Sequence, residues 1–255
     1  MNLQGKTIVI TGASSGIGAE VARLVRFHGA KVIGMDRNDP NLTLDGFVKA
    51  DLSSVATIDA AVAQLPAQID AFCNIAGVPG TADGDLVARV NYLGLRHLTE
   101  AVLPRMPHGS SIVNVASILG AEWPLRLDLH KELAAVKGFE AGVHWLRGHP
   151  VPHATCYQYF KEALIVWNAV QSQEWFLGKG VRMNCVAPGP VFTPILGDFV
   201  AMLGEKRIQE DAHRMLRPAF ADEVAAVITW LCSDGARWVS GVNIPVDGGL
   251  ASTYL

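Results

Sequence analysis

The stretch that decides the fold is Lys6-Thr-Ile-Val-Ile-Thr11, followed directly by Gly12-Ala-Ser-Ser-Gly-Ile-Gly18. The first segment is mostly apolar and β-branched, which is typical of a buried strand. A helical pattern follows from Ala19 to His28, and Gly29 ends it. A strand that enters a glycine-rich turn and then a helix predicts a dinucleotide-binding unit, because the positive end of the helix faces the phosphates.

The three glycines of this turn have separate expected roles. Gly12 permits the sharp turn, Gly16 lets the backbone approach a pyrophosphate, and Gly18 lets the helix pack closely. The alternative interpretation is an ordinary tight connection between a strand and a helix.

Six further apolar segments predict strands, at residues 30–35, 47–50, 69–74, 111–116, 180–186 and 242–246. Helical patterns at 58–64, 85–103 and 222–232 alternate with them. This alternation predicts a parallel sheet, and strands that are apolar throughout indicate that both faces are covered. We therefore expect an α/β fold with a doubly wound, parallel, seven-stranded Rossmann sheet, as a single domain over residues 1–255.

Residues 119–153 interrupt the alternation after the fifth strand. They contain Trp123, Trp145 and a helical pattern from Leu127 to Phe139. We interpret this segment as a lid-like insertion that precedes the helix of Tyr157, and the alternative is a surface insertion without a role.

Composition narrows the choice of partners. Half of the 255 residues are hydrophobic, 18% are charged, and the formal net charge is −3. Without a basic run, nucleic acid is not an expected partner. We expect no membrane contact and a cytoplasmic location, because no apolar stretch approaches the ~20 residues of a membrane span and no secretory signal is visible. The cysteines form no CxxC pair, and we expect each to be buried and reduced: Cys73, Cys156, Cys185 and Cys232.

Asp36 follows the second predicted strand. A carboxylate there accepts hydrogen bonds from the adenosine ribose and repels a 2′-phosphate, which favours NAD over NADP. Arg37 could instead bind such a phosphate. We predict NAD.

Tyr157 and Lys161 are four residues apart in a segment with helical character, so they share a face. A nearby ammonium stabilises a phenolate and lowers the phenol pKa, so Tyr157 can exchange a proton with an alcohol. Ser117 ends the fifth strand, where its hydroxyl can hold the substrate oxygen. Tyr159 has no lysine four residues later, and we expect it to pack.

Together these motifs resemble the short-chain dehydrogenase/reductase family over essentially the whole chain. The turn matches the family's TGxxxGxG motif. Asn74-Ile-Ala-Gly77 resembles its NNAG stretch, with Ile75 in place of the second asparagine. Further matches are Asp51-Leu52, Asn91, Pro188-Gly-Pro-Val-Phe-Thr193 and Asp247-Gly-Gly249.

The resemblance implies a catalytic tetrad of Asn91, Ser117, Tyr157 and Lys161, in which Asn91 supports a water-linked proton relay to the lysine. It also implies that Lys161 bonds the nicotinamide ribose and that Thr193 holds the carboxamide. The cofactor contacts it implies are Gly12, Ser15, Gly16, Ile17, Gly18, Asp36, Asp51, Leu52, Asn74, Ala76, Gly77, Tyr157, Lys161, Pro188, Gly189, Val191 and Thr193.

Ser117 and Tyr157 are 40 residues apart, and this long insertion resembles the bacterial 3α-hydroxysteroid dehydrogenase/carbonyl reductase branch. Residues 119–124, 130–133, 156–164 and 247–254 resemble members that oxidise phenolic cinnamyl alcohols in lignin-monomer breakdown. The expected function is NAD-dependent oxidation of coniferyl alcohol to coniferaldehyde, with direct hydride transfer and Tyr157 as acid/base. The alternatives are a 3α-hydroxysteroid dehydrogenase/carbonyl reductase and a non-catalytic nucleotide-sensing protein, against which an intact tetrad argues.

An aromatic alcohol needs an apolar slot with a few polar anchors. For its aromatic wall we predict Trp123, Trp145, Phe192 and Phe199, and for its polar contacts His130, Glu122 or Gln158. We predict no metal, because the spacings of the four clustered histidines fit no ligand motif: His130, His144, His149 and His153. We expect a homodimer or homotetramer.

Overall fold

The computed structural model describes residues 1–254. Its centre is a seven-stranded sheet in the order β3-β2-β1-β4-β5-β6-β9, in which every neighbouring pair is parallel. The strands are β1 (Thr7–Thr11), β2 (Lys31–Asp36), β3 (Gly46–Lys49), β4 (Ala71–Asn74), β5 (Ser111–Val115), β6 (Arg182–Pro188) and β9 (Asn243–Val246). The prediction of a doubly wound parallel sheet of seven strands is confirmed, with strand ends that differ by one or two residues.

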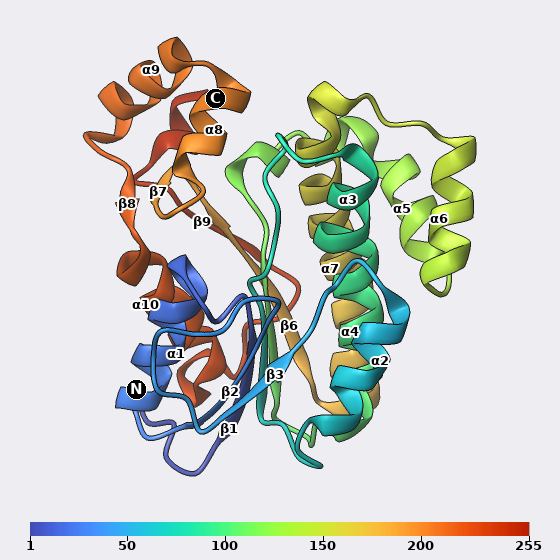
Figure 1. Cartoon of the computed structure of the whole chain (residues 1–255), viewed down its shortest axis with the longest axis vertical. Coiled ribbons are helices and arrows are strands. Elements are labelled where there is room, and N and C mark those ends of the chain that lie inside the picture. The colour runs from blue at the N-terminus through green and yellow to red at the C-terminus, as the bar shows by residue number, and fades with distance from the viewer. Residues whose placement is uncertain (255) are drawn as a thin grey trace.

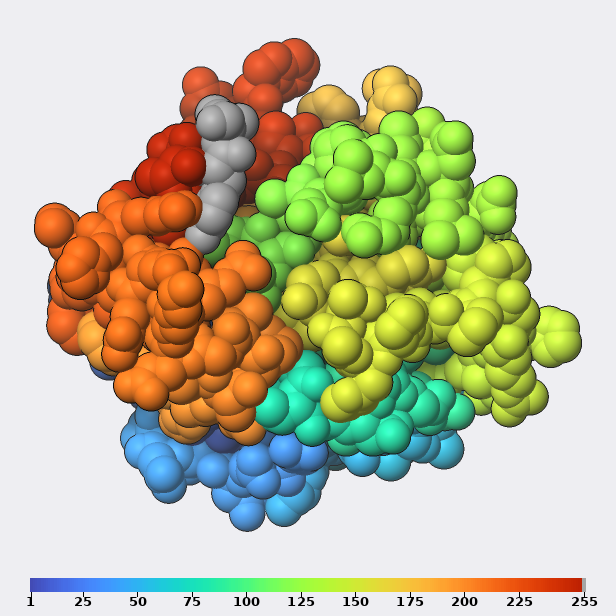
Figure 2. Space-filling view, turned by 90° about the horizontal axis from the view of Figure 1, so that it is seen from above, coloured from blue at the N-terminus to red at the C-terminus, as the bar shows by residue number. Residues whose placement is uncertain are grey.

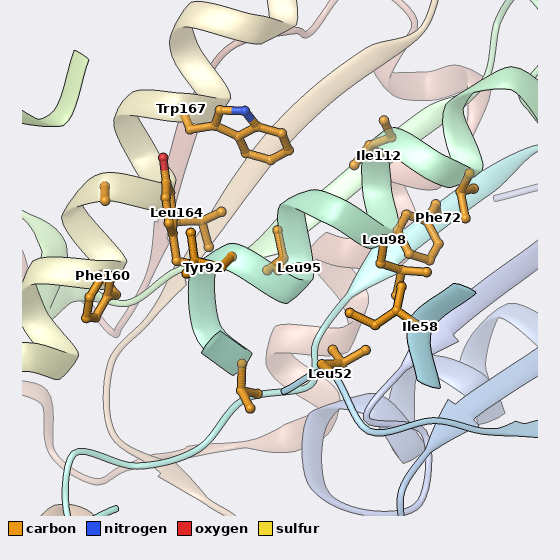
Figure 3. Packing of buried hydrophobic residues seen from close by; sticks show 14 of the residues in the cluster. Leu52, Ile58, Phe72, Tyr92, Leu95, Leu98, Ile112, Phe160, Leu164 and Trp167 are labelled. Atoms are coloured by element: carbon orange, nitrogen blue, oxygen red, sulfur yellow. The ribbon is translucent and has the colours of Figure 1, made fainter. Parts of the chain in front are cut away.

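Helices cover both faces of the sheet (Figure 1). One face carries α1 (Gly16–Phe27) and α10 (Ala221–Cys232), which pack on each other. The other carries α2 (Val55–Gln64), α4 (Leu95–Val102) and α7 (Cys156–Lys179). This second layer holds the larger part of the core, where Phe72 and Ile112 of the sheet meet the buried side chains of these helices (Figure 3).

The helix predicted over residues 85–103 is interrupted by a wide turn. It consists of α3 (Gly84–Ala88), a π-helical turn over Arg89–Gly94, and α4. A Cβ on Gly94 would lie 1.9 Å from the Leu52 carbonyl oxygen, so only glycine allows this approach of helix and loop. Turns of this type often occur at functional sites, and this one contains Asn91.

The insertion folds into two helices, α5 (Leu127–Ala135) and α6 (Phe139–Gly148), instead of the single helix predicted from Leu127 to Phe139. The break falls at Gly138, whose φ of 87° is a conformation that only glycine adopts readily. Both helices lie on the outer flank beside α7, on the opposite side of the molecule from α8 and α9 (Figure 1).

Three features of the C-terminal part have no counterpart in the sequence-based prediction. They are α8 (Leu196–Leu203), α9 (Glu205–Met215), and a small parallel pair of β7 (Val191–Phe192) with β8 (Ala219–Phe220). In the described residues, no helix combines the length and the apolar character that crossing a membrane would require.

Candidate active site

The glycine-rich turn lies where the strand order reverses, between β1 and its neighbours β2 and β4. Parallel α/β sheets bind ligands at such a point, beyond the carboxyl ends of the strands. The Thr11 hydroxyl at the end of β1 accepts hydrogen bonds from the backbone N–H of Ile75, at 2.9 Å, and of Ala76, at 3.1 Å. Thr11 therefore ties the turn to the loop after β4.

This turn fits a pyrophosphate. Gly12 and Gly16 have positive φ values of 71° and 53°, and a Cβ on Gly12 would lie 2.8 Å from the Ala76 nitrogen. Ser15 does not cap α1 with its side chain, and the first turn of α1 has no acidic residue. The free N–H groups and positive end of α1 are therefore available to an anion.

A cavity of about 1220 Å³ extends from this turn to the ends of β2 and β3. Asp36 is the last residue of β2, and its carboxylate accepts hydrogen bonds from the backbone N–H of Ser14 and of Asn38. Both Asp36 and Arg37 line the cavity, together with Asp51 and Leu52. These two hydrogen bonds thus hold the carboxylate in place within the cavity, at the carboxyl end of β2.

A second cavity, of about 830 Å³, contains Ser117, Tyr157 and Lys161. Ser117 directly precedes a short 3₁₀ turn after β5, and Tyr157 and Lys161 lie one turn apart on α7. All three side chains are nearly buried. The Lys161 ammonium donates a hydrogen bond of 2.7 Å to the Val115 carbonyl and lies 5.6 Å from the centre of the Tyr157 ring.

Burial dominates the protonation of this group. It raises the pKa of the Tyr157 phenol well above the ordinary value, and the neighbouring Ser117 hydroxyl lowers it only in part. Burial also lowers the pKa of the Lys161 amine to about 8. The expected lowering of the Tyr157 pKa by the ammonium is therefore not what the chain has by itself: the phenol stays protonated near neutral pH.

The two cavities share residues around the junction of β1, β4 and the loop after β6. Ile75, Gly77 and Thr193 line both of them. Each residue of the expected cofactor set lines at least one cavity, with the exception of Asn74.

Asn74, the member of the expected cofactor set outside both cavity linings, has a buried side chain. Its side-chain amide donates to Thr99 Oγ1 at 2.8 Å and to Asn114 Oδ1 at 2.9 Å, and it is buried between β4 and its neighbours. Two donated hydrogen bonds thus hold this side-chain amide against α4 and β5, and its contact with a cofactor stays a prediction. Only the loop that follows Asn74 reaches the cavity.

Asn91 lies in the π-helical turn and is fully buried. Its side chain forms two hydrogen bonds with the backbone of Val78, accepting at 2.8 Å and donating at 2.9 Å. Gly77 separates Asn91 from Lys161, since a Cβ there would lie 3.2 Å from Asn91 Oδ1 and 4.0 Å from Lys161 Nζ. The structure thus places Asn91 near Lys161, at one end of the expected tetrad.

Part of the wall of the cavity that contains Ser117 comes from α8 and α9, which supply Phe199, Leu203, Ile208 and Asp211. Thr81 donates a 3.0 Å hydrogen bond to Asp198 of α8, which joins α8 to the loop after β4. Figure 2 looks down on this end of the molecule and shows the orange α8–α9 segment beside the teal part of the chain.

Of the four aromatic residues expected in the substrate slot, Phe199 lines the cavity. Trp123 packs against the core, Trp145 stacks on His149 with ring centroids 3.9 Å apart, and Phe192 packs on Phe220. Of residues 119–153, the described lining of the cavity contains Leu119 and no other residue. This arrangement does not favour the expected lid-like role of the insertion.

The expected polar contacts also lie elsewhere. Glu122 is exposed, and Gln158 does not line the cavity. His130 is fully buried, with Nε2 2.8 Å from Glu162, which also receives two hydrogen bonds from Arg126. Glu162 belongs to α7, so its contacts with Arg126 and His130 attach the insertion to that helix. The same contacts satisfy the buried carboxylate, which would be costly without partners.

The other three clustered histidines, His144, His149 and His153, are exposed. Within residues 1–254, the structure has no group of three or more His, Cys, Asp or Glu side chains that could hold a metal ion. The four cysteines are buried and free, as predicted. Tyr159 packs on His130 and Phe160, also as predicted.

Comparison with known proteins agrees with this fold. A family model described as short chain dehydrogenase matches residues 6–126, and one described as Enoyl-(Acyl carrier protein) reductase matches residues 146–251. The chain belongs to the short-chain dehydrogenase/reductase family, and it is an oxidoreductase that uses a nicotinamide cofactor.

Among its relatives, coniferyl-alcohol dehydrogenase of Pseudomonas sp. (strain HR199 / DSM 7063) is 67% identical over the full length of both chains. The 3-alpha-hydroxysteroid dehydrogenase/carbonyl reductase of Comamonas testosteroni is 32% identical over 95% of both chains. The solved structure of 3-alpha-hydroxysteroid dehydrogenase from Pseudomonas sp. B-0831 complexed with NADH superposes with a TM-score of 0.80, at 29% identity over 98% of both chains.

Proposed function

We propose that this chain oxidises coniferyl alcohol to coniferaldehyde with NAD. The observation that carries the proposal is the apolar cavity that holds Ser117, Tyr157 and Lys161 and joins the cofactor cavity at Gly77 and Thr193. Full-length identity of 67% with a coniferyl-alcohol dehydrogenase supports the choice of substrate.

The proposed reaction needs three tasks from the protein. Ser117 holds the alcohol oxygen, and Tyr157 takes its proton as the carbonyl forms. Lys161 donates hydrogen bonds to the cofactor ribose and lies close enough to stabilise a Tyr157 phenolate. When bound, the nicotinamide cofactor would supply the hydride acceptor, so that the alcohol loses a hydride from its carbinol carbon and a proton to Tyr157, two electrons and two protons in all.

The burial of Tyr157 determines the protonation state in which its phenol enters the reaction. Because burial raises the pKa of Tyr157, its phenol is ready to donate a proton in aldehyde reduction. In alcohol oxidation the phenol must first lose that proton. Asn91 would pass it onward from Lys161 through water, which its place beside Gly77 supports.

The selection of NAD rests on Asp36. Two backbone hydrogen bonds hold its carboxylate at the end of β2. At this place it would accept hydrogen bonds from the ribose hydroxyls and repel a 2′-phosphate. Arg37 lines the same cavity and works against this preference.

In this proposal α8 and α9 cover the substrate, because their side chains form part of the cavity wall. We further propose a cytoplasmic homodimer or homotetramer that acts in lignin-monomer breakdown and needs no metal. Buried free thiols favour a reducing compartment.

A hydroxysteroid is the second candidate substrate, and the TM-score of 0.80 to the 3-alpha-hydroxysteroid dehydrogenase favours it. Formation of NADH should be followed by absorbance with coniferyl alcohol and, separately, with a 3α-hydroxysteroid. Faster turnover of coniferyl alcohol supports the proposal. Turnover of the steroid alone would replace the substrate and leave the proposed chemistry in place.

A further inference from the structure

The turn that follows Ser117 packs directly on the backbone of α7. It is the 3₁₀ turn Ile118–Gly120. A Cβ on Gly120 would lie 3.0 Å from the carbonyl carbon of Lys161 and 3.1 Å from the backbone nitrogen of Glu162. Gly120 does not have a positive φ, so the conformation of the turn does not itself require glycine. The approach to the helix requires it, because backbone atoms within a helix cannot rotate away as a side chain can.

Ser117 depends on this turn for its position. Its hydroxyl accepts a hydrogen bond of 3.2 Å from the backbone N–H of Leu119, which lies inside the turn. The same hydroxyl is a hydrogen-bond partner of the Tyr157 phenol: burial raises the pKa of that phenol, and the bond to Ser117 lowers it in part. Tyr157 belongs to α7, so the packing of the turn on α7 determines how far Ser117 lies from Tyr157.

A buried ionic cluster attaches the next part of the chain to the same place on α7. The Glu162 side chain is 1% exposed, and its carboxylate accepts hydrogen bonds of 2.8 and 3.0 Å from Arg126. His130 Nε2 lies 2.8 Å from the same carboxylate. The backbone nitrogen of Glu162 is also one of the atoms on which Gly120 packs. The chain after Ser117 is thus fixed to one turn of α7 at two points, Gly120 and Arg126.

We propose that Gly120 is a positioning residue that sets the distance between Ser117 and Tyr157 during the reaction. This inference rests on the proposed function, in which Ser117 holds the alcohol oxygen while Tyr157 takes its proton. In the described part of the chain, Gly120 lies outside the linings of both cavities, so it acts through Ser117 and not by contact with substrate or cofactor. Residues 119–153 thus contribute to the reaction from behind the site, because their attachment to α7 fixes Ser117 against Tyr157.

The test places a methyl group between the turn and the helix by the substitution Gly120→Ala, so that the turn must shift by a few tenths of an ångström. We expect kcat for coniferyl alcohol to fall on the order of 10-fold, because small displacements of positioned groups are costly in rate, while NADH still binds. The deciding measurement repeats the substitution in Ser117→Ala, with single-turnover rates. There Gly120→Ala should have no further effect, since the hydroxyl that it positions is absent.

Gly148→Ala is the matched control: a Cβ on this glycine of the same insertion would meet nothing within 4 Å, so its kcat should equal that of the wild type. Thermal melting establishes that each variant is folded. If Gly120→Ala does not fold, Arg126→Lys takes its place in the same comparison, since it keeps a positive charge beside Glu162 but alters the geometry of the attachment. An unchanged kcat in the folded variant, or an equal fall of the rate with and without the Ser117 hydroxyl, would overturn the inference while the proposed function stands. A wild type that does not oxidise coniferyl alcohol would overturn the proposed function itself.

Discussion

Phe199 of α8 rests with its ring edge to face on Tyr157, with ring centroids 5.3 Å apart and planes at 78°. This contact joins the segment over the cavity to the tyrosine at its base. Aromatic pairs of this geometry contribute about 0.5–1.5 kcal/mol beyond the area that they bury. The position of Tyr157 therefore depends on α8 as well as on α7.

Replacing Phe199 with alanine should weaken substrate binding. The variant loses the aromatic wall of the cavity, so KM for coniferyl alcohol should rise on the order of 10-fold. The Kd of NADH should not change, because Phe199 does not line the cofactor cavity. Steady-state kinetics and a fluorescence titration with NADH measure the two quantities.

Phe192→Ala is the matched control, since Phe192 packs on Phe220 and does not line the substrate cavity. Its KM should equal that of the wild type. The same rise of KM in both variants would contradict the assignment of the wall to α8.

Asp36→Asn should shift the cofactor preference toward NADP. Ser14 and Asn38 donate to different carboxylate oxygens, so the amide keeps an acceptor for one of them, and it removes the charge that repels a 2′-phosphate. We expect the ratio of kcat/KM for NADP to that for NAD to rise on the order of 10-fold. Asp39→Asn, which changes an exposed neighbour paired with Lys49, should leave this ratio in place. An identical ratio in Asp36→Asn and the wild type would assign cofactor selection to another group.

Lys161 should make the stability of the cofactor-free protein depend on pH. Burial lowers the pKa of its amine from 10.5 in the unfolded chain to about 8 in the folded one. Between these two values the unfolded chain binds more protons, so the free energy of unfolding rises with pH. Lys161→Met has no group to titrate there. From about pH 7 to about pH 9.5, urea unfolding should show the wild type gaining on the order of 2 kcal/mol relative to this variant. Parallel pH dependences of the two proteins would contradict the buried, cationic state of Lys161.

The sequence predicts the parts of the site that depend on local patterns. The segment from Lys6 to Gly18 carries its own strand, turn and helix signals, so β1 and α1 follow from it directly. Tyr157 and Lys161 share a face because helical spacing alone requires it. Gly138 is a helix-stop signal within the single helix predicted from Leu127 to Phe139, and the helix breaks there between α5 and α6.

The cover of the cavity could not be predicted, because it depends on contacts between distant parts of the chain. Phe199 meets Tyr157 across 42 positions, and Thr81 meets Asp198 across 117. No local period shows that α8 closes over the site while the insertion packs on the outer side of α7. The side-chain hydrogen bonds of Asn74 could not be predicted for the same reason, since both partners come from other elements.

The most direct test of the central claim is a single-turnover measurement on Tyr157→Phe, which removes the hydroxyl and leaves the ring against Phe199. We expect that NADH still binds, while oxidation of coniferyl alcohol slows by a factor on the order of 10² or more, the usual scale of general acid–base catalysis. Unchanged oxidation would contradict the role of Tyr157. Tight NADH binding in a wild type that turns over no alcohol would instead indicate a nucleotide-sensing protein.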